Sequence, residues 1–336
     1  MKIAMMAAGV IALGPLVLSG QSADEAQPKA PFTWSIADGA LTFDVPRGEK
    51  LVFDVQVDIG VLGDPEIGTM TIETGVEPYE AGVLVGETAD AGAEVGWIRA
   101  VATGESVFYS VEEVLTTSYL PQTWPQTLHR KVQTGSENRR AEQKIGLHDG
   151  KRTVWSRRDR HCKECDDRTH WLKPRFTWSE ETHCQRCKKA EHRVWGEPET
   201  RGVDERAVDM LSAVLIAREM VASGARRRDF QVLDRIKPWD VRMRTGGRKV
   251  VELPLGNYDA VLLRLETKIP EGEPPREETK FKGLFGLKGS IEIWLEANSG
   301  VPVWITGTVP AGPIDVGIEA RLREVVGAPA SFVPAE

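Results

Sequence analysis

The chain has 336 residues, with 43 lysines and arginines against 50 aspartates and glutamates, and a formal net charge of −7. This acidic balance argues against a protein that binds nucleic acid through its overall charge. Hydrophobic residues make up 41% of the chain, enough to bury a core, so disorder is excluded for most of the sequence. Beyond the first twenty residues, no stretch is apolar enough to span a bilayer.

The first 26 residues are typical of a signal peptide for export. Lys2 supplies a positive charge, residues 3–18 are mostly apolar, and Ser19–Ala26 are small or polar. An uncleaved membrane anchor is the alternative, but the apolar stretch is shorter than the about 20 residues that a spanning helix needs. Gln21 stands where a lipoprotein signal has cysteine, so no thiol is available for a lipid. We therefore expect a periplasmic or secreted protein whose residues up to about Ala30 are not part of the fold, with no stable membrane span after cleavage.

Alternating apolar and polar residues dominate the rest of the chain. Leu51, Phe53, Val55, Val57 and Ile59 alternate with polar residues, which is the period of a half-buried strand. Shorter runs of the same kind follow, separated by glycine, proline, aspartate and asparagine. The strands predicted in this way are residues 51–59, 69–74, 82–87, 96–102, 128–133, 140–147, 229–236, 239–244, 249–253, 258–269, 290–296, 301–308 and 314–324. Because no helices separate most of them, an antiparallel sheet is expected.

One segment has the period of a helix. Between Asp204 and Gly224, apolar residues recur at spacings of three, four and seven. Asp204 is the expected N-cap and Gly224 the expected C-terminal stop. Core packing is the preferred interpretation of the apolar stripe, and a partner-binding helix is the alternative.

Two loop segments follow the helix. Residues 270–278 are acidic and rich in proline, which excludes regular structure. Phe281–Gly289 is apolar and punctuated by glycine, and we expect a mobile hairpin there. A packed turn is favoured over a flap that contacts an apolar ligand.

The four cysteines fall in one short stretch. Cys162, Cys165, Cys184 and Cys187 form a C-x2-C-x18-C-x2-C pattern, which lies within the range of zinc sites. Each C-x2-C turn directs two thiolates at one ion, and two turns complete a tetrahedron. The two halves resemble each other, since Trp155-Ser156 and Trp178-Ser179 precede them. Residues 151–200 are therefore expected to form a zinc-ribbon-like insert with a structural zinc ion.

Alternatives to zinc remain open. Two disulfides are a serious rival because oxidising compartments favour them, and a redox-active or iron-binding C-x2-C pair is the third candidate. Four cysteine ligands close the coordination sphere, which favours a structural role over a catalytic one. Histidines next to the cysteines could replace a ligand or bind a second ion, although imidazoles outside the metal site are preferred; these are His161, His170, His183 and His192.

No motif assigns a catalytic residue or an organic cofactor. The chain lacks the nucleophile elbow, the H-E-x-x-H zinc motif, the P-loop and the dinucleotide fingerprint. Scattered acids such as Glu112, Glu113, Asp209 and Glu292 are interpreted as surface charge. The sequence therefore leans toward a protein that is not an enzyme.

Several segments resemble the bacterial exported family called "domain of unknown function 3108". The resemblance spans about Pro46 to Val325, and its most specific piece is Asp209-Met210-Leu211-Ser212-Ala213 with Arg218. Other matching pieces are Gly48–Val55, Tyr109–Glu113, Thr117–Leu120, Ile291–Leu295, Gly300–Val303 and Ile314–Gly317. The resemblance implies an exported, β-rich protein with no assigned catalytic residues. The cysteine module departs from this pattern and is expected to be an insertion.

Taken together, these observations predict a mainly β fold. We expect one curved antiparallel sheet, as a half-barrel, open barrel or sandwich, with one packing helix; residues 31–150 and 201–327 would form this single discontinuous domain. The hypothesis for function is a non-enzymatic binding protein for an apolar or envelope-derived ligand or partner. The alternatives are an envelope assembly or adaptor protein that docks through the zinc ribbon, and a thiol-redox protein.

Overall fold

The structure is a computed structural model that describes residues 48–58, 66–78, 94–106, 109–119, 127–135, 138–161, 183–184, 189–190, 193–276, 281, 283–311 and 314–335. The expected signal peptide, the expected strand at 82–87, and three of the four cysteines lie outside these residues. The described residues belong to one compact unit.

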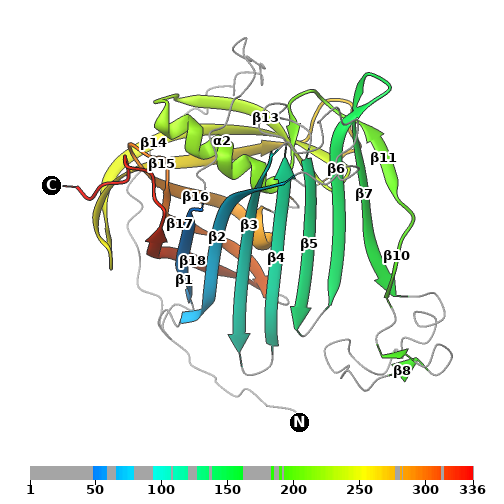
Figure 1. The fold of residues 1–336 in the computed structure, drawn as a ribbon, viewed down its shortest axis with the longest axis horizontal. Helices are drawn as coiled ribbons and strands as arrows, with labels where there is room; N and C mark the ends of the chain where they lie inside the picture. The colour runs from blue at the N-terminus through cyan, green and yellow to red at the C-terminus, as the bar shows by residue number, and fades with distance from the viewer. Residues whose placement is uncertain are drawn as a thin grey trace, which may run out of the picture. The chain divides into compact units, whose positions relative to one another are not determined.

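Seven consecutive strands begin the sheet and run side by side in chain order (Figure 1). They are β1 (Lys50–Asp58), β2 (Glu66–Pro78), β3 (Glu94–Ser106), β4 (Tyr109–Tyr119), β5 (Thr127–Gly135), β6 (Arg139–His148) and β7 (Lys151–His161). Each pairs antiparallel with the next.

Short strands follow β7. These are β8 (His183–Cys184), β9 (Lys189–Ala190), β10 (Arg193–Trp195), β11 (Glu199–Gly202) and β12 (Ala207–Val208). Both β10 and β11 pair with β7, so residues that the sequence assigned to the insert belong to the main sheet. Only β8 and β9 form a separate two-stranded ladder in the described part of the chain.

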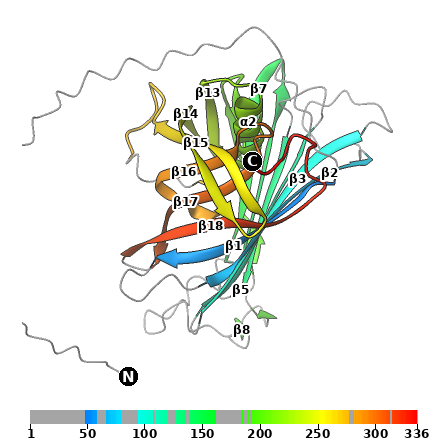
Figure 2. The same ribbon diagram turned by 90° about the vertical axis from the view of Figure 1, so that its left-hand side faces the viewer.

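The second half of the sheet is another meander, made of β13 (Arg227–Asp234), β14 (Lys237–Leu253), β15 (Gly256–Lys268), β16 (Lys288–Glu296), β17 (Pro302–Ala311) and β18 (Ile314–Val326). β18 pairs with β1, which joins the two halves, as Figure 2 shows where β16, β17, β18 and β1 follow one another. The result is one large, open, curved sheet that is not closed into a barrel. The predicted mainly β, antiparallel fold with one helix is confirmed.

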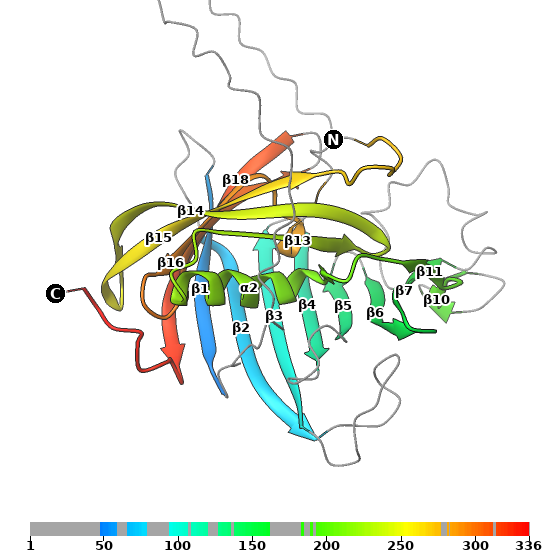
Figure 3. The ribbon, with the colours of Figure 1, turned by 90° about the horizontal axis from the view of Figure 1, so that it is seen from above.

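Helix α2 (Met210–Ala222) lies on the concave side of the sheet, between β13 and the ends of β1–β5 (Figure 3). Its buried side chains include Leu211, Leu215, Ile216 and Met220, which pack into the core as expected for an amphipathic helix. Among the described residues, no helix combines the length and apolar character needed to cross a membrane.

The predicted start of this helix is wrong. Asp209, not Asp204, is the N-cap, and its side chain accepts hydrogen bonds from the backbone N–H groups of Leu211 and Ser212. Ala207 and Val208 form strand β12 instead, and the Asp204 carboxylate binds the backbone and side chain of Arg206. The predicted end is close, because Ser223 is the C-cap and Gly224 follows it at φ +70°.

Two contacts attach the far end of α2 to the sheet. The Arg218 guanidinium forms a two-point ion pair with Glu49, in which Nη2 donates to Oε1 at 3.0 Å, and both side chains are buried. Gly300 adopts φ +68° directly against the helix backbone, where an added Cβ would lie 2.3 Å from the Arg218 carbonyl oxygen. Only glycine combines this close approach with this backbone conformation.

Candidate functional site

Side chains on the concave face of the sheet are buried near α2 and only half-buried farther from it. Near the helix, Leu51, Ile72 and Ile98 are almost completely buried. Because side chains alternate between the two faces of a strand, every second residue further along these strands lies on the same face. Those residues are only half-buried, so the core ends partway along the sheet.

Beyond this point, half-buried aliphatic residues from five strands lie on the concave face. Cross-strand pairing places them in neighbouring positions, with Val55 opposite Ala320 and Val57 opposite Ile318. Val309 pairs with Val316 in the same way. We call this set the concave apolar surface: Val55, Val57, Ala102, Val111, Val309, Val316 and Ile318.

The expected hairpin at Phe281–Gly289 packs against this side of the sheet. It contains a short 3-10 helix, η4 (Leu284–Gly286). Leu287 is buried, and its Cδ2 lies 3.1 Å from the position that a Cβ on Gly307 would occupy. Phe281 packs edge-to-face on Trp239 at 5.5 Å. For the described residues the packed-turn interpretation is therefore confirmed, although Leu284 and Phe285 remain half-buried.

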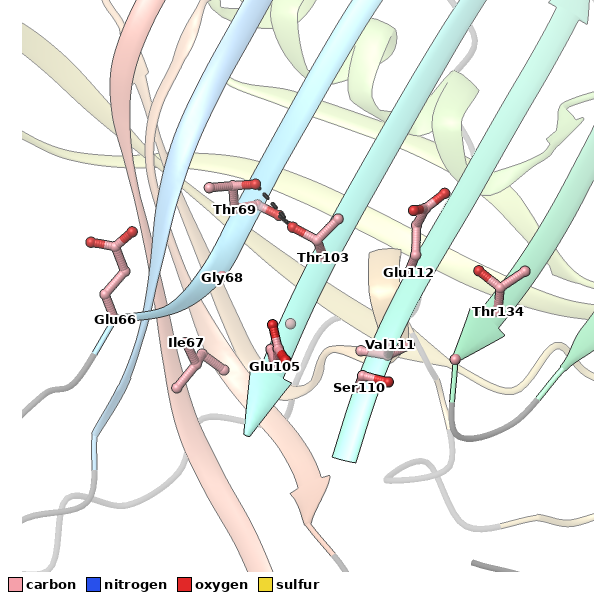
Figure 4. Close-up of a pocket in the computed structure, with 12 residues that line it drawn as sticks. Glu66, Ile67, Gly68, Thr69, Thr103, Glu105, Ser110, Val111, Glu112 and Thr134 are labelled. Atoms are coloured by element: carbon pink, nitrogen blue, oxygen red, sulfur yellow. Dashed lines mark hydrogen bonds between the residues drawn. The ribbon is translucent and has the colours of Figure 1, made fainter. Parts of the chain in front are cut away.

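A hollow of about 620 Å³ lies at the ends of β2–β5, with most of its lining side chains on the face turned away from α2 (Figure 4). Val111 belongs to both the hollow and the concave apolar surface, and Ile67 adds a second aliphatic side chain to the hollow. The remaining lining is polar and consists of Glu66, Glu105, Glu112, Thr69, Thr103, Ser110 and Thr134 with three glycines. The volume is within the range of small-molecule sites.

The glycines allow the strands to approach closely at the hollow. A Cβ on Gly68 would lie 1.8 Å from the Thr103 carbonyl oxygen, and one on Gly135 would lie 2.3 Å from the Ser110 carbonyl oxygen. Thr69 and Thr103 are joined across the strands by a hydroxyl hydrogen bond of 3.0 Å. The register places Thr69, Thr103, Glu112 and Thr134 in one cross-strand row on the face opposite Val111, so these polar groups of the hollow lie on the convex side of the sheet.

A buried polar network lies between the sheet and the N-terminus of α2. The Thr117 hydroxyl donates to Asp209 Oδ1 at 2.7 Å and lies 2.8 Å from His129 Nδ1. Since the single hydroxyl proton is used on Asp209, the ring Nδ1–H of His129 donates to Thr117. Ser212 donates its hydroxyl to Asp209 Oδ2 at 2.6 Å. Burial lowers the pKa of His129, partly offset by the Asp209 charge, so the ring is neutral near pH 7.

The acids noted in the sequence have structural partners. Glu113 forms an ion pair with Lys131 at 2.7 Å on the concave face, and Glu292 lies 3.5 Å from Arg264. Asp209 caps the helix, and Glu112 lines the hollow. Within the described residues, no three metal-ligating side chains form a cluster.

The cysteine module is described only in part. Cys162, Cys165 and Cys187 lie outside the described residues, whereas Cys184 lies in β8, where it pairs with Lys189 of β9. His161 at the end of β7 pairs with Arg193 at the start of β10, so the chain leaves and rejoins the sheet at adjacent positions. The zinc site therefore stays a prediction.

The fold and this surface define a class of β-rich proteins with an open curved sheet and one helix on its concave side. A scan of protein families matches residues 175–319 to the family described as "Protein of unknown function (DUF3108)". The match covers less than half of the chain and includes α2 with the Asp209 motif. It supports the resemblance in that range.

Among solved structures, the chain is similar to a protein of Bacteroides fragilis NCTC 9343 that is described, with reservation, as exported and as having a YmcC-like fold. The identity is 8% and the TM-score is 0.30, with 85% of this chain and 99% of that chain covered, which is too weak to argue from. No curated protein matches the chain.

Proposed function

We propose that this protein is an exported, non-enzymatic binding protein that holds an apolar ligand against the concave apolar surface. The observation that carries the proposal is the row of half-buried aliphatic side chains on five strands, open on one side and bounded by α2 and η4. Contiguous apolar area left open to water mostly marks a binding site, since covering it gains about 25 cal/mol for each Å².

An apolar ligand would lie on the valines of β1, β4, β17 and β18, because cross-strand pairing and alternation place their side chains on the same, concave face. Export rests on the signal-peptide pattern of residues 1–26.

The ligand proposal is tested on protein purified from the exported fraction of the cell. Native mass spectrometry should show a bound small molecule, and organic extraction should release it for identification. The Val111→Asp variant introduces a charge on the concave apolar surface and should be purified without that molecule. Wild-type protein that is consistently empty would refute the proposal.

A structural zinc ion bound by Cys162, Cys165, Cys184 and Cys187 completes the proposed function. The two C-x2-C pairs support it, and the adjacent ends of the module allow it to fold as a separate unit on the sheet. Metal analysis with thiol alkylation tests it: one zinc per chain and four thiols that react after chelation are expected. Four protected sulfurs without metal would show two disulfides instead, and two protected sulfurs that open and close with the redox state would favour thiol-redox chemistry.

A further inference from the structure

The convex face at the β7 edge of the sheet carries an ordered set of arginine, lysine and tryptophan side chains. Cross-strand pairing forms rows over β5, β6 and β7, with Arg130, Glu142 and Arg157 in one row. In the next row along, Leu128, Lys144 and Trp155 are aligned. We call this set the basic face: Arg130, Arg140, Lys144, Trp155, Arg157, Arg193 and Trp195.

Stacking on the indole rings fixes the cations in place. The Arg157 guanidinium lies 4.4 Å from the Trp195 ring and 5.1 Å from the Trp155 ring. Arg140 lies 4.8 Å from the Trp195 ring, and Lys144 lies 5.5 Å from the Trp155 ring. These are cation–π distances, so the charges are held at set positions on the sheet.

Carboxylates under the basic face balance only part of its charge. Glu142 accepts from Arg130 at 3.2 Å and Arg157 at 2.9 Å, and Asp159 accepts from Arg140 and Arg193. The carboxylates are buried, with 9% and 2% of their side chains exposed, whereas Arg130 and Arg140 are 59% and 46% exposed. Five cations stand over two anions, so the face presents positive charge to the solvent.

The excess of positive charge at this edge of the sheet is also present in the sequence. Residues 127–161 contain ten lysines and arginines against four aspartates and glutamates, in a chain whose net charge is −7. The remainder of the chain is therefore strongly acidic, and the excess of positive charge is concentrated at one edge of the sheet. A dipolar charge distribution of this kind orients a protein toward an anionic surface.

We propose that the basic face docks on a lipid bilayer that contains anionic phospholipids. The cations come from four neighbouring strands about 4.8 Å apart, β5, β6, β7 and β10, and on β6 Arg140 and Lys144 are four residues apart, or about 13 Å. Charges spread in this way fit many headgroups rather than one ligand. Arginine binds phosphate oxygens through two N–H groups, and tryptophan is enriched at membrane interfaces. A set of charges spread over four strands, with indole rings between them, fits an interface better than it fits an acidic protein segment. This inference goes beyond the ligand proposal and does not depend on it.

The test uses the mature protein purified from the exported fraction and sedimentation with vesicles of phosphatidylglycerol and phosphatidylcholine, or of phosphatidylcholine alone. The Arg130→Gln, Lys144→Gln double variant removes two charges while Glu142 keeps Arg157 as its partner. The matched control is Arg244→Gln, Arg264→Gln, which removes two exposed charges, each near one glutamate, from the other half of the sheet. Thermal unfolding of each variant verifies that it is folded, and Arg130→Lys, Lys144→Arg preserves the charge.

Wild-type protein is expected to bind the anionic vesicles only, and more weakly as salt is added. The double variant should bind about thirtyfold more weakly, which corresponds to about 1 kcal/mol for each charge. The charge-preserving variant should bind as wild type, and the control within about twofold of it. Equal binding to both kinds of vesicle, an equal loss in the control, or a loss in the charge-preserving variant would overturn the proposal. Binding to polyglutamate without binding to vesicles would overturn it in favour of an acidic protein partner.

Discussion

Replacement of Asp209 by alanine should destabilise the protein far more than replacement of Asp204. Asp209 is completely buried and accepts four hydrogen bonds, from the backbone N–H groups of Leu211 and Ser212 and from the hydroxyls of Thr117 and Ser212. Asp204 has a third of its side chain exposed and is bound by Arg206, which is two residues away. The two aspartates are thus chemically identical and structurally different.

The size of the effect follows from these contacts. Loss of the N-cap costs about 1 kcal/mol. The buried hydroxyls of Thr117 and Ser212 lose an acceptor, which adds about 2 kcal/mol. Asp209→Ala should therefore lower the free energy of unfolding by about 3 kcal/mol. Asp204→Ala should lower it by less than about 1 kcal/mol, because a partly exposed ion pair contributes little.

Urea unfolding followed by tryptophan fluorescence is suitable, since the chain has ten tryptophans. A double-mutant cycle between Asp209→Ala and Thr117→Val should give a coupling of about 1 kcal/mol, because the second change has little left to remove once the acceptor is gone. A loss below 1 kcal/mol for Asp209→Ala, or a greater loss for Asp204→Ala, would refute the assignment of the cap and of the network.

Two further predictions concern the contact between α2 and the sheet. His129→Gln should reduce the dependence of unfolding free energy on pH between 5 and 7: burial, which is the largest cause, lowers the pKa of His129 in the folded state, so the unfolded chain takes up the proton first and wild-type stability falls as pH drops below about 6.5. Urea titrations at several pH values measure how the unfolding free energy depends on pH in wild type and in the variant. The same pH dependence in both proteins would contradict the burial of a neutral ring. Gly300→Ala should cost about 2 kcal/mol or more, because φ is +68° and the new Cβ would lie 2.3 Å from the Arg218 carbonyl oxygen; unchanged thermal stability would show that the close approach is not required.

Much of the sheet could be predicted from sequence because alternation survives wherever one face is apolar and the other is wet. Strand β4 was not predicted, because its residues do not alternate between apolar and polar in this way. On its concave face Val111, Leu115 and Tyr119 alternate with Glu113 and Thr117, which are buried with polar partners in Lys131 and Asp209. Buried polar groups need such partners from distant parts of the chain. Their burial therefore cannot be predicted from the local alternation of apolar and polar residues.

The error at the helix start has a related cause. Val208 fits the apolar stripe of the helix, but it is buried because β12 pairs with β13. Periodicity reports that a residue is buried and does not say in which element. Val55 and Val57 were visible as the apolar face of one strand, whereas their partners Ala320 and Ile318 come from the other end of the chain. The concave apolar surface is therefore a product of strand pairing.

The central claim is that the concave apolar surface binds an apolar ligand, and titration with the fluorescent probe N-phenyl-1-naphthylamine tests it most directly. Val111 lies on that surface, whereas Val132 lies on the opposite face of the neighbouring strand and is 39% exposed. We expect saturable binding to wild type, retained by Val132→Asp and weakened at least tenfold by Val111→Asp, because the introduced carboxylate would be desolvated by the bound probe. Equal probe affinity in the two variants, or no saturable binding to wild type, would contradict the account.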